Sequence, residues 1–259
     1  MMNRLRVPRA SLETASFAAQ QDPPVGSAAY TRAKTAADQP VAFFAPVHYE
    51  PNYAYPLLVW LHGPGDDENQ LKRIMPHVSL RNHVGVSVCG TTTYASASGK
   101  AGFTWAQTPP HVALAEQRVF DAISASQARF NVSPRRIFLA GFDCGGTMAL
   151  RLALSHPRRF SGALSLGGEF PVGGAPLSCL TEARRVPVFL ACGRDSRRYP
   201  SAVVCENLKL LHSAGISLTL REYPGGHSIS PAMLSDIDRW IMELVTGASA
   251  PGADCAGEG

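Results

Sequence analysis

The stretch Arg136-Ile-Phe-Leu-Ala-Gly-Phe-Asp-Cys-Gly-Gly-Thr-Met-Ala-Leu150 decides the fold. Residues 137–140 form a short apolar run that predicts a buried strand, and residues 147–154 predict the start of a helix. Between them lies Gly-x-Asp-x-Gly, centred on Asp143. A sharp strand-to-helix turn flanked by small residues is typical of a nucleophile elbow. Such a turn strains the backbone of its central residue and pushes that side chain into the site.

These residues resemble the α/β-hydrolase superfamily. The nearest likeness is to its carboxylesterase/phospholipase branch, which includes dienelactone-hydrolase-like and polyhydroxyalkanoate-depolymerase-like esterases. The resemblance covers residues 41–246 and implies an α/β-hydrolase fold. Enzymes of this branch carry Gly-x-Ser-x-Gly-Gly, whereas this chain has Asp143 at the serine position. That departure limits how far their activity can be carried over.

Apolar runs and helical periodicity alternate from residue 56 to 244, which predicts a mostly parallel sheet with helices on both faces. About 20 residues separate the expected strands 162–166 and 186–191, a gap too short for a cap domain. We expect one domain over residues 39–246. Residues 1–38 are expected to be an extension, either partly disordered or wrapping the domain as a strand or short helix, and residues 247–259 a flexible tail.

The composition bounds the class of protein. The chain has 259 residues, 45% of them hydrophobic and 17% charged, with a net charge of +4. Its arginine pairs are scattered and are expected on solvated faces, so no nucleic-acid partner is predicted. No apolar run is long enough for a membrane span, and no secretion signal is recognised. The six cysteines lack metal-site spacing. These features predict a cytoplasmic protein that takes a small molecule, without metal or cofactor.

Two further residues follow strands in the order that the resemblance requires. Asp195 comes just after the strand 186–191, and His227 follows the strand 217–222 within Gly-Gly-His. The resemblance implies that His227 is the catalytic histidine and Asp195 the acid that orients it. Glu169, which follows the preceding strand, is a rival acid. The alternatives are that Asp195 lies in a surface turn and that His227 has no role.

The loop after the strand 56–61 departs from the family pattern. In the esterase branch, the residue after His-Gly donates a backbone N–H to the oxyanion hole. Here that residue is Pro64, which has no N–H, so only the Cys144 N–H remains. His62 is expected to brace this loop. In the loop 90–110, the aromatic residues either line a substrate pocket or pack the loop down: Tyr94, Phe103 and Trp105.

A carboxylate at the elbow suits displacement at a saturated carbon, as in haloalkane dehalogenases and epoxide hydrolases. Asp143 would then be the nucleophile. Alternatively it only caps the following helix. Cys144 is a third candidate, as in dienelactone hydrolases, but that frame places Phe142 where glycine is needed, and the neighbouring carboxylate would raise the pKa of the thiol.

Two functions therefore stay open. One is a carboxylesterase-like hydrolase with an Asp143–His227–Asp195 triad acting on small ester-like or alkyl substrates. The other is an inactive hydrolase-fold protein that binds a ligand or partner through the retained pocket.

Overall fold

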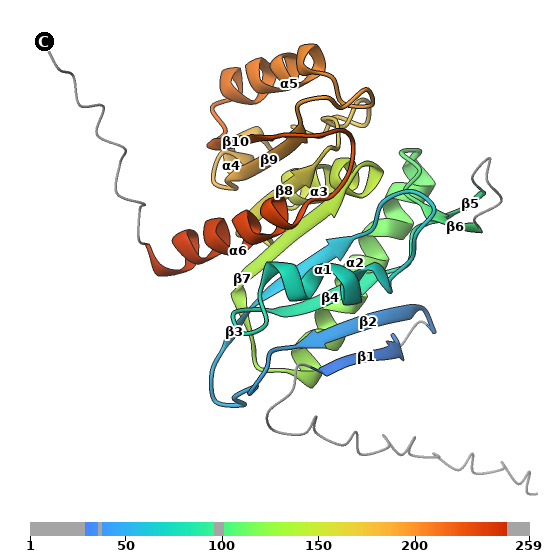
Figure 1. The fold of residues 1–259 in the computed structure, drawn as a ribbon, viewed down its shortest axis with the longest axis vertical. Coiled ribbons are helices and arrows are strands. Elements are labelled where there is room, and N and C mark those ends of the chain that lie inside the picture. The colour runs from blue at the N-terminus through green and yellow to red at the C-terminus, as the bar shows by residue number, and fades with distance from the viewer. Residues whose placement is uncertain (1–28, 36–37, 96–100, 248–259) are drawn as a thin grey trace, which may run out of the picture.

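In the computed structural model, which describes residues 29–35, 38–95 and 101–247, eight strands form one sheet in the order β1-β2-β4-β3-β7-β8-β9-β10 (Figure 1). β1 and β4 run antiparallel to β2, and all other neighbours in this sheet are parallel. The predicted mostly parallel sheet is therefore confirmed. The strands are β1 (Ala29–Lys34), β2 (Pro40–Ala45), β3 (Tyr55–Leu61), β4 (Val84–Val88), β7 (Val132–Phe142), β8 (Gly162–Leu166), β9 (Val188–Gly193) and β10 (Leu218–Tyr223).

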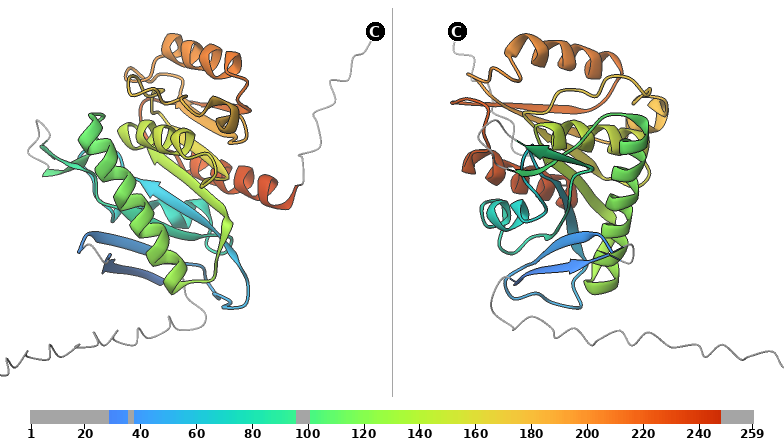
Figure 2. Two further views of the ribbon diagram at one scale, coloured as in Figure 1. Left: turned by 180° about the vertical axis from the view of Figure 1, so that it is seen from behind. Right: turned by 90° about the vertical axis from the view of Figure 1, so that its right-hand side faces the viewer.

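Helices cover both faces of this sheet, with α2 on one side and α1 and α6 on the other (Figure 2). β3 shows why, since all of its side chains are buried and successive residues enter opposite cores. Leu57 and Val59 pack in the core beneath α2 and α3, whereas Trp60 packs in the core beneath α1 and α6. The helices are α1 (Gln70–Val78), α2 (Pro109–Arg129), α3 (Cys144–Ser155), α4 (Leu180–Ala183), α5 (Ser201–Ser213) and α6 (Pro231–Thr246).

Two segments differ from the sequence prediction, and a third follows one of its alternatives. β1 lies inside the predicted extension and pairs with β2, which fits the strand alternative for this region, so the sheet begins before residue 39. β7 starts five residues before the expected strand. Its first half is polar and partly exposed, so it lacks the apolar run from which the strand was predicted. The expected loop 90–110 contains an antiparallel hairpin, β5 (Thr92–Ala95) and β6 (Ala101–Thr104). Residues 1–28 and 248–259 lie outside the described part of the chain.

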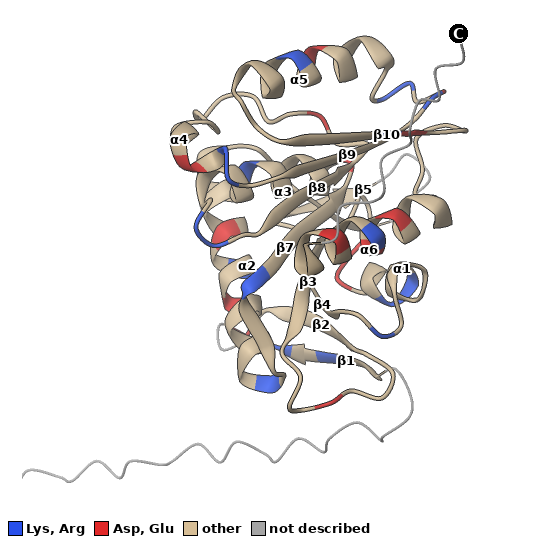
Figure 3. Cartoon of the chain, turned by 90° about the vertical axis from the view of Figure 1, so that its left-hand side faces the viewer, with Lys and Arg blue, Asp and Glu red and all other residues tan. Residues whose placement is uncertain are grey.

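Between β8 and β9 only α4 intervenes, so the described residues hold no cap domain there, as expected. Lysines and arginines are distributed among several elements (Figure 3). Within the described ranges, no helix is long and apolar enough to cross a membrane. Because β7, β8, β9 and β10 are parallel, the loops at their carboxyl ends meet at one edge of the sheet.

Candidate functional site

The elbow predicted around Asp143 is present where β7 turns into α3. Asp143 has φ 51° and ψ −122°, a conformation that L-residues adopt only under strain. The turn is possible because its glycines touch backbone. A Cβ on Gly145 would lie 2.3 Å from the Leu61 carbonyl oxygen, and one on Gly141 would lie 2.4 Å from the Gly145 carbonyl carbon. The side chain of Asp143 makes no capping hydrogen bond to α3, so it does not serve as a helix cap.

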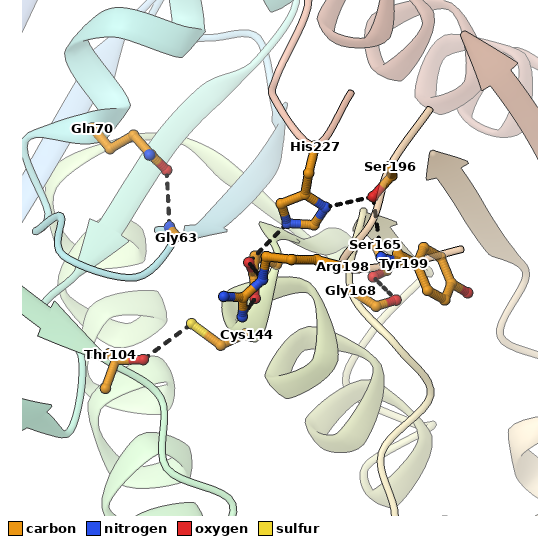
Figure 4. Close-up of polar contacts among 11 residues, drawn as sticks. Gly63, Gln70, Thr104, Cys144, Ser165, Gly168, Ser196, Arg198, Tyr199 and His227 are labelled. Carbon is orange, nitrogen blue, oxygen red and sulfur yellow. Dashed lines mark hydrogen bonds and ion pairs between the residues drawn. The ribbon is translucent and has the colours of Figure 1, made fainter. Parts of the chain in front are cut away.

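The side chains of His227 and Arg198, both labelled in Figure 4, contact the carboxylate of Asp143. Nε2 of His227 lies 2.8 Å from Oδ2. Arg198 contacts both oxygens, with Nε 2.9 Å from Oδ2 and Nη2 3.2 Å from Oδ1. Burial raises the pKa of Asp143, but the hydrogen bond from His227, the charge of Arg198 and the hydrogen bond from the Cys144 backbone act in the opposite direction, and the pKa lies below its ordinary value. Asp143 is therefore ionised at neutral pH.

The other nitrogen of His227 contacts Ser196 rather than Asp195. The Ser196 hydroxyl lies 3.0 Å from Nδ1 and also accepts a hydrogen bond from the Tyr199 backbone N–H at 3.1 Å. Asp195 is exposed, and no interaction among the described residues joins its carboxylate to the histidine. The structure thus corrects the expected Asp195–His227 contact. The tight turn after β9 directs residue 195 outward and residue 196 inward, since the Asp195 N–H bonds the Gly225 carbonyl.

These contacts define which nitrogen of neutral His227 carries the proton. An ionised carboxylate can only accept, so Nε2 must donate to Asp143. Nδ1 then accepts a hydrogen bond from the Ser196 hydroxyl, and the oxygen of that hydroxyl accepts a hydrogen bond from the Tyr199 backbone N–H. In a serine-hydrolase triad, the proton is on Nδ1 and Nε2 acts as base. The tautomer here is the reverse.

The loop that follows β3 lacks the usual oxyanion geometry. Gly63 donates its N–H to Gln70 Oε1 at 3.3 Å, and Pro64 has none to donate. His62 is fully buried between two backbone groups: Gly90 N–H donates to Nε2 at 2.8 Å, and Nδ1 donates to the Gly63 carbonyl at 2.7 Å. Burial lowers the pKa of His62, so the ring is neutral and braces the loop.

The thiol of Cys144 lies 3.2 Å from Oγ1 of Thr104. Burial raises the pKa of Cys144, and the charge of Asp143 acts in the same direction. Because the thiolate is the nucleophilic form, this environment opposes the Cys144 alternative.

A cavity of about 280 Å³ opens beside the elbow. Its lining combines charged, polar and apolar groups: Gln107, Asp143, Cys144, Thr147, Gly167, Glu169, Phe170, Val172 and Arg198. Glu169 is exposed at this cavity and is not bonded to His227, so the rival acid does not orient the histidine.

The lining of this cavity does not include the aromatic residues Tyr94, Phe103 and Trp105. Their contacts fit the other interpretation, in which these aromatic residues pack the loop down. Trp105 is buried and donates Nε1–H to the His62 carbonyl at 3.0 Å. The backbone of Phe103 bonds Gly65 and Asp66, and a Cβ on Gly65 would lie 3.2 Å from the Tyr94 ring. The hairpin therefore fixes the loop that carries Pro64.

Sequence reasoning missed Ser196, Arg198 and Gln107. The pair Arg197-Arg198 was expected on a solvated face, and Arg198 is 64% exposed, but its guanidinium reaches Asp143. No motif marks a contact between residues 55 positions apart. Among the described residues, no group of three or more His, Cys, Asp or Glu side chains could hold a metal ion.

The family model described as Phospholipase/Carboxylesterase matches residues 46–245. The chain belongs to this family. It is 30% identical over 131 residues to the carboxylesterase SOBER1 of Arabidopsis thaliana, a match that spans 50% of this chain but only 58% of the relative. A probable carboxylesterase of the same plant, described as SOBER1-like, is 24% identical, with 74% of this chain and 80% of the relative covered.

The crystal structure of Arabidopsis thaliana SOBER1 has the same fold. It aligns with a TM-score of 0.62 and 24% identity, and the alignment covers 74% of this chain and 100% of that chain. This phospholipase/carboxylesterase fold is therefore established for the chain, while the chemistry must be argued from its own residues.

Proposed function

We propose that this protein binds a small molecule in the cavity beside Asp143 and forms no covalent intermediate with it. The observation that carries the proposal is the engagement of both Asp143 oxygens, one by Arg198 and the other by Arg198 and His227. Ion pairing and charge-assisted hydrogen bonds draw electron density away from this carboxylate.

Three further features support loss of the esterase reaction that the relatives' names describe. Attack of a carboxylate on an ester gives an anhydride, which is an unfavourable product. Neutral His227 carries its proton on the nitrogen that should act as base. Pro64 removes one oxyanion donor, and the loss of one such donor costs about 3 kcal/mol of transition-state stabilisation in serine hydrolases.

A second function is favoured by the position of Asp143 at a strained elbow, with His227 in hydrogen-bond range and a cavity in front. In this hydrolase, Asp143 would displace a leaving group from a saturated carbon, and His227 would activate water against the alkyl ester. Asp195, the expected acid of that Asp–His–Asp triad, is exposed, and Ser196 occupies the His227 nitrogen that this acid would contact. This candidate therefore ranks second.

Hydrolysis of short p-nitrophenyl esters by the wild type, Asp143→Ala and Asp143→Ser tests the proposal. We expect the wild type to match Asp143→Ala, and Asp143→Ser to be the more active variant. Ester hydrolysis in the wild type that collapses in Asp143→Ala would refute the proposal. Turnover of alkyl halides or epoxides that depends on Asp143 would establish the second candidate instead.

A further inference from the structure

Arg198 offers the cavity a charged surface that Asp143 does not use. The contacts to Asp143 come from Nε and Nη2, which form one edge of the planar guanidinium. The second edge is formed by Nη1 and the other N–H of Nη2, and Nη1 has no hydrogen-bond or ion-pair partner among the described residues. Arg198 lines the cavity, and a guanidinium edge matches the two oxygens of a carboxylate. Asp143 thus holds an arginine ready for an anion.

The negative charge of Asp143, at the base of the cavity, is not available to a cationic ligand. Both oxygens of Asp143 are already engaged by His227 and Arg198, so a cationic ligand would have to displace an ion pair. Glu169 is the other carboxylate of the lining, and it is exposed. Water and salt screen its charge, yet it stays close enough to the cavity to disfavour a ligand with two negative charges.

A buried cation lies behind the cavity wall. Arg151 is only 4% exposed, and its three nitrogens bond neutral acceptors: Gln107 Oε1 at 2.8 Å, the Val172 carbonyl at 2.7 Å and the Gly173 carbonyl at 2.8 Å. Among the described residues, it has no carboxylate partner. A buried charge without a counter-ion makes the adjoining cavity more favourable for an anion. The Gln107 oxygen is occupied by Arg151, and one amide N–H donates to the Trp105 carbonyl at 3.5 Å, which leaves the second amide N–H for a ligand.

The same cavity has an apolar side. Phe170 and Val172 line it, and Val172 is 84% exposed although it is a large aliphatic residue. Its backbone carbonyl is fixed by Arg151, so the exposed side chain sits on an anchored segment. A hydrocarbon chain lying on Val172 would remove this apolar surface from water.

We propose that the ligand is a small monocarboxylate with a hydrocarbon tail, its carboxylate on the free edge of Arg198 and its tail against Phe170 and Val172. This inference rests on the proposed binding function and names its ligand class. The cavity volume of about 280 Å³ restricts the ligand to a short chain or a single ring.

Calorimetric titration with hexanoate and with hexanamide at neutral pH tests this assignment. The two molecules share a tail and differ in charge. We expect hexanoate to bind more tightly, and Arg198→Gln to weaken hexanoate binding by about 10- to 100-fold, as for loss of a hydrogen-bonded charged group. Arg197→Gln is the matched control, because Arg197 is an exposed neighbouring arginine outside the cavity lining, and it should leave binding unchanged. Glu169→Gln should tighten hexanoate binding.

Equal affinity for hexanoate and hexanamide, or equal effects of Arg198→Gln and Arg197→Gln, would overturn the ligand class. Absence of hexanoate binding up to millimolar concentrations would do the same. The ester assay reports separately on the proposed function. If hexanamide binds as well as hexanoate and ester hydrolysis is absent, the binding function stands and only the ligand class is wrong.

Discussion

The hydroxyl of Ser196 lies 3.0 Å from Nδ1 of His227, at the position where the family resemblance calls for a carboxylate. On the other side of the ring, Asp143 takes the position of the serine. The chain therefore holds a serine, a histidine and an aspartate in one hydrogen-bonded row, but with the serine and the aspartate exchanged. Ser196 is only 5% exposed and is absent from the cavity lining, so it is placed to hold the histidine and not to attack a substrate.

Reversing the exchange should restore ester hydrolysis. We expect Asp143→Ser alone to be weakly active on p-nitrophenyl esters, because the new hydroxyl gains His227 but the ring lacks an orienting acid. Adding Ser196→Asp should raise kcat further, by up to the ~10²–10⁴-fold that general acid–base catalysis contributes. Ser196→Asp alone should be inactive. A double variant no faster than Asp143→Ser would show that residue 196 does not orient the histidine.

The tautomer of His227 can be observed directly. In ¹⁵N-resolved NMR spectra recorded where the imidazole is neutral, we expect the proton on Nε2 in the wild type, since Asp143 can only accept. In Asp143→Ser combined with Ser196→Asp, the proton should move to Nδ1. A wild-type ring with the proton on Nδ1 would contradict the hydrogen-bond assignment at both ends.

Restoring an amide at position 64 tests the oxyanion argument. In the Asp143→Ser background, Pro64→Gly should raise kcat on p-nitrophenyl esters, with the ~10²–10³-fold effect of one oxyanion donor as the upper limit. In the wild-type background the same change should have no effect, because no tetrahedral intermediate forms. The hydrogen bonds of Gly65 and Asp66 to Phe103 hold the surrounding loop in both cases. If the double variant has the same kcat as Asp143→Ser alone, the missing N–H of Pro64 does not limit ester hydrolysis.

The low pKa of Asp143 makes a pH-dependent contribution to stability. The folded-state pKa lies below the ordinary value of 3.8, so the contribution is present above pH 3.8 and is lost as the pH falls through the folded value. Asp143→Asn should therefore be less stable than the wild type near neutral pH, and the difference should shrink below about pH 4. Urea unfolding across this pH range measures it. The exposed Asp195→Asn is the control, and should stay within about 0.5 kcal/mol of the wild type.

The elbow glycines should be far less tolerant than glycines in open space. Gly145→Ala places a Cβ 2.3 Å from the Leu61 carbonyl oxygen, and backbone cannot move aside cheaply. We expect a loss of at least about 2 kcal/mol in the free energy of unfolding. Gly226→Ala is the matched control, because nothing lies within 4 Å of its added Cβ. Equal losses in the two variants would mean that the close approach does not govern stability.

The sequence predicted the parallel sheet and the elbow because both depend on local signals. Apolar runs such as β3 indicate buried strands whatever they contact, and Gly141 and Gly145 mark a sharp turn by their spacing. The order of Asp143 and His227 along the chain also placed both at one edge of the sheet. These two residues were correctly expected to be neighbours.

Residues whose role depends on a turn or a long side chain were not predicted. A one-residue difference in the turn after β9 decides whether Asp195 or Ser196 faces the histidine, and that turn is fixed by hydrogen bonds to the next loop. Arg198 belongs to an exposed segment, and its flexible chain reaches Asp143 through space. The strands β5 and β6 have only four residues each, which is too short for an alternating pattern to be recognised.

The elbow backbone is specified by what surrounds residue 143. Gly141 and Gly145 give the clearance, and the Asp143 N–H bonds the Leu166 carbonyl, so the side chain alone projects into the cavity. A substitution there changes the chemical group that faces the cavity, while the surrounding backbone keeps its course. The residue type at position 143 can thus change without a change of fold. In evolution, hydrolysis can therefore be gained or lost at this position while every strand and helix stays in place.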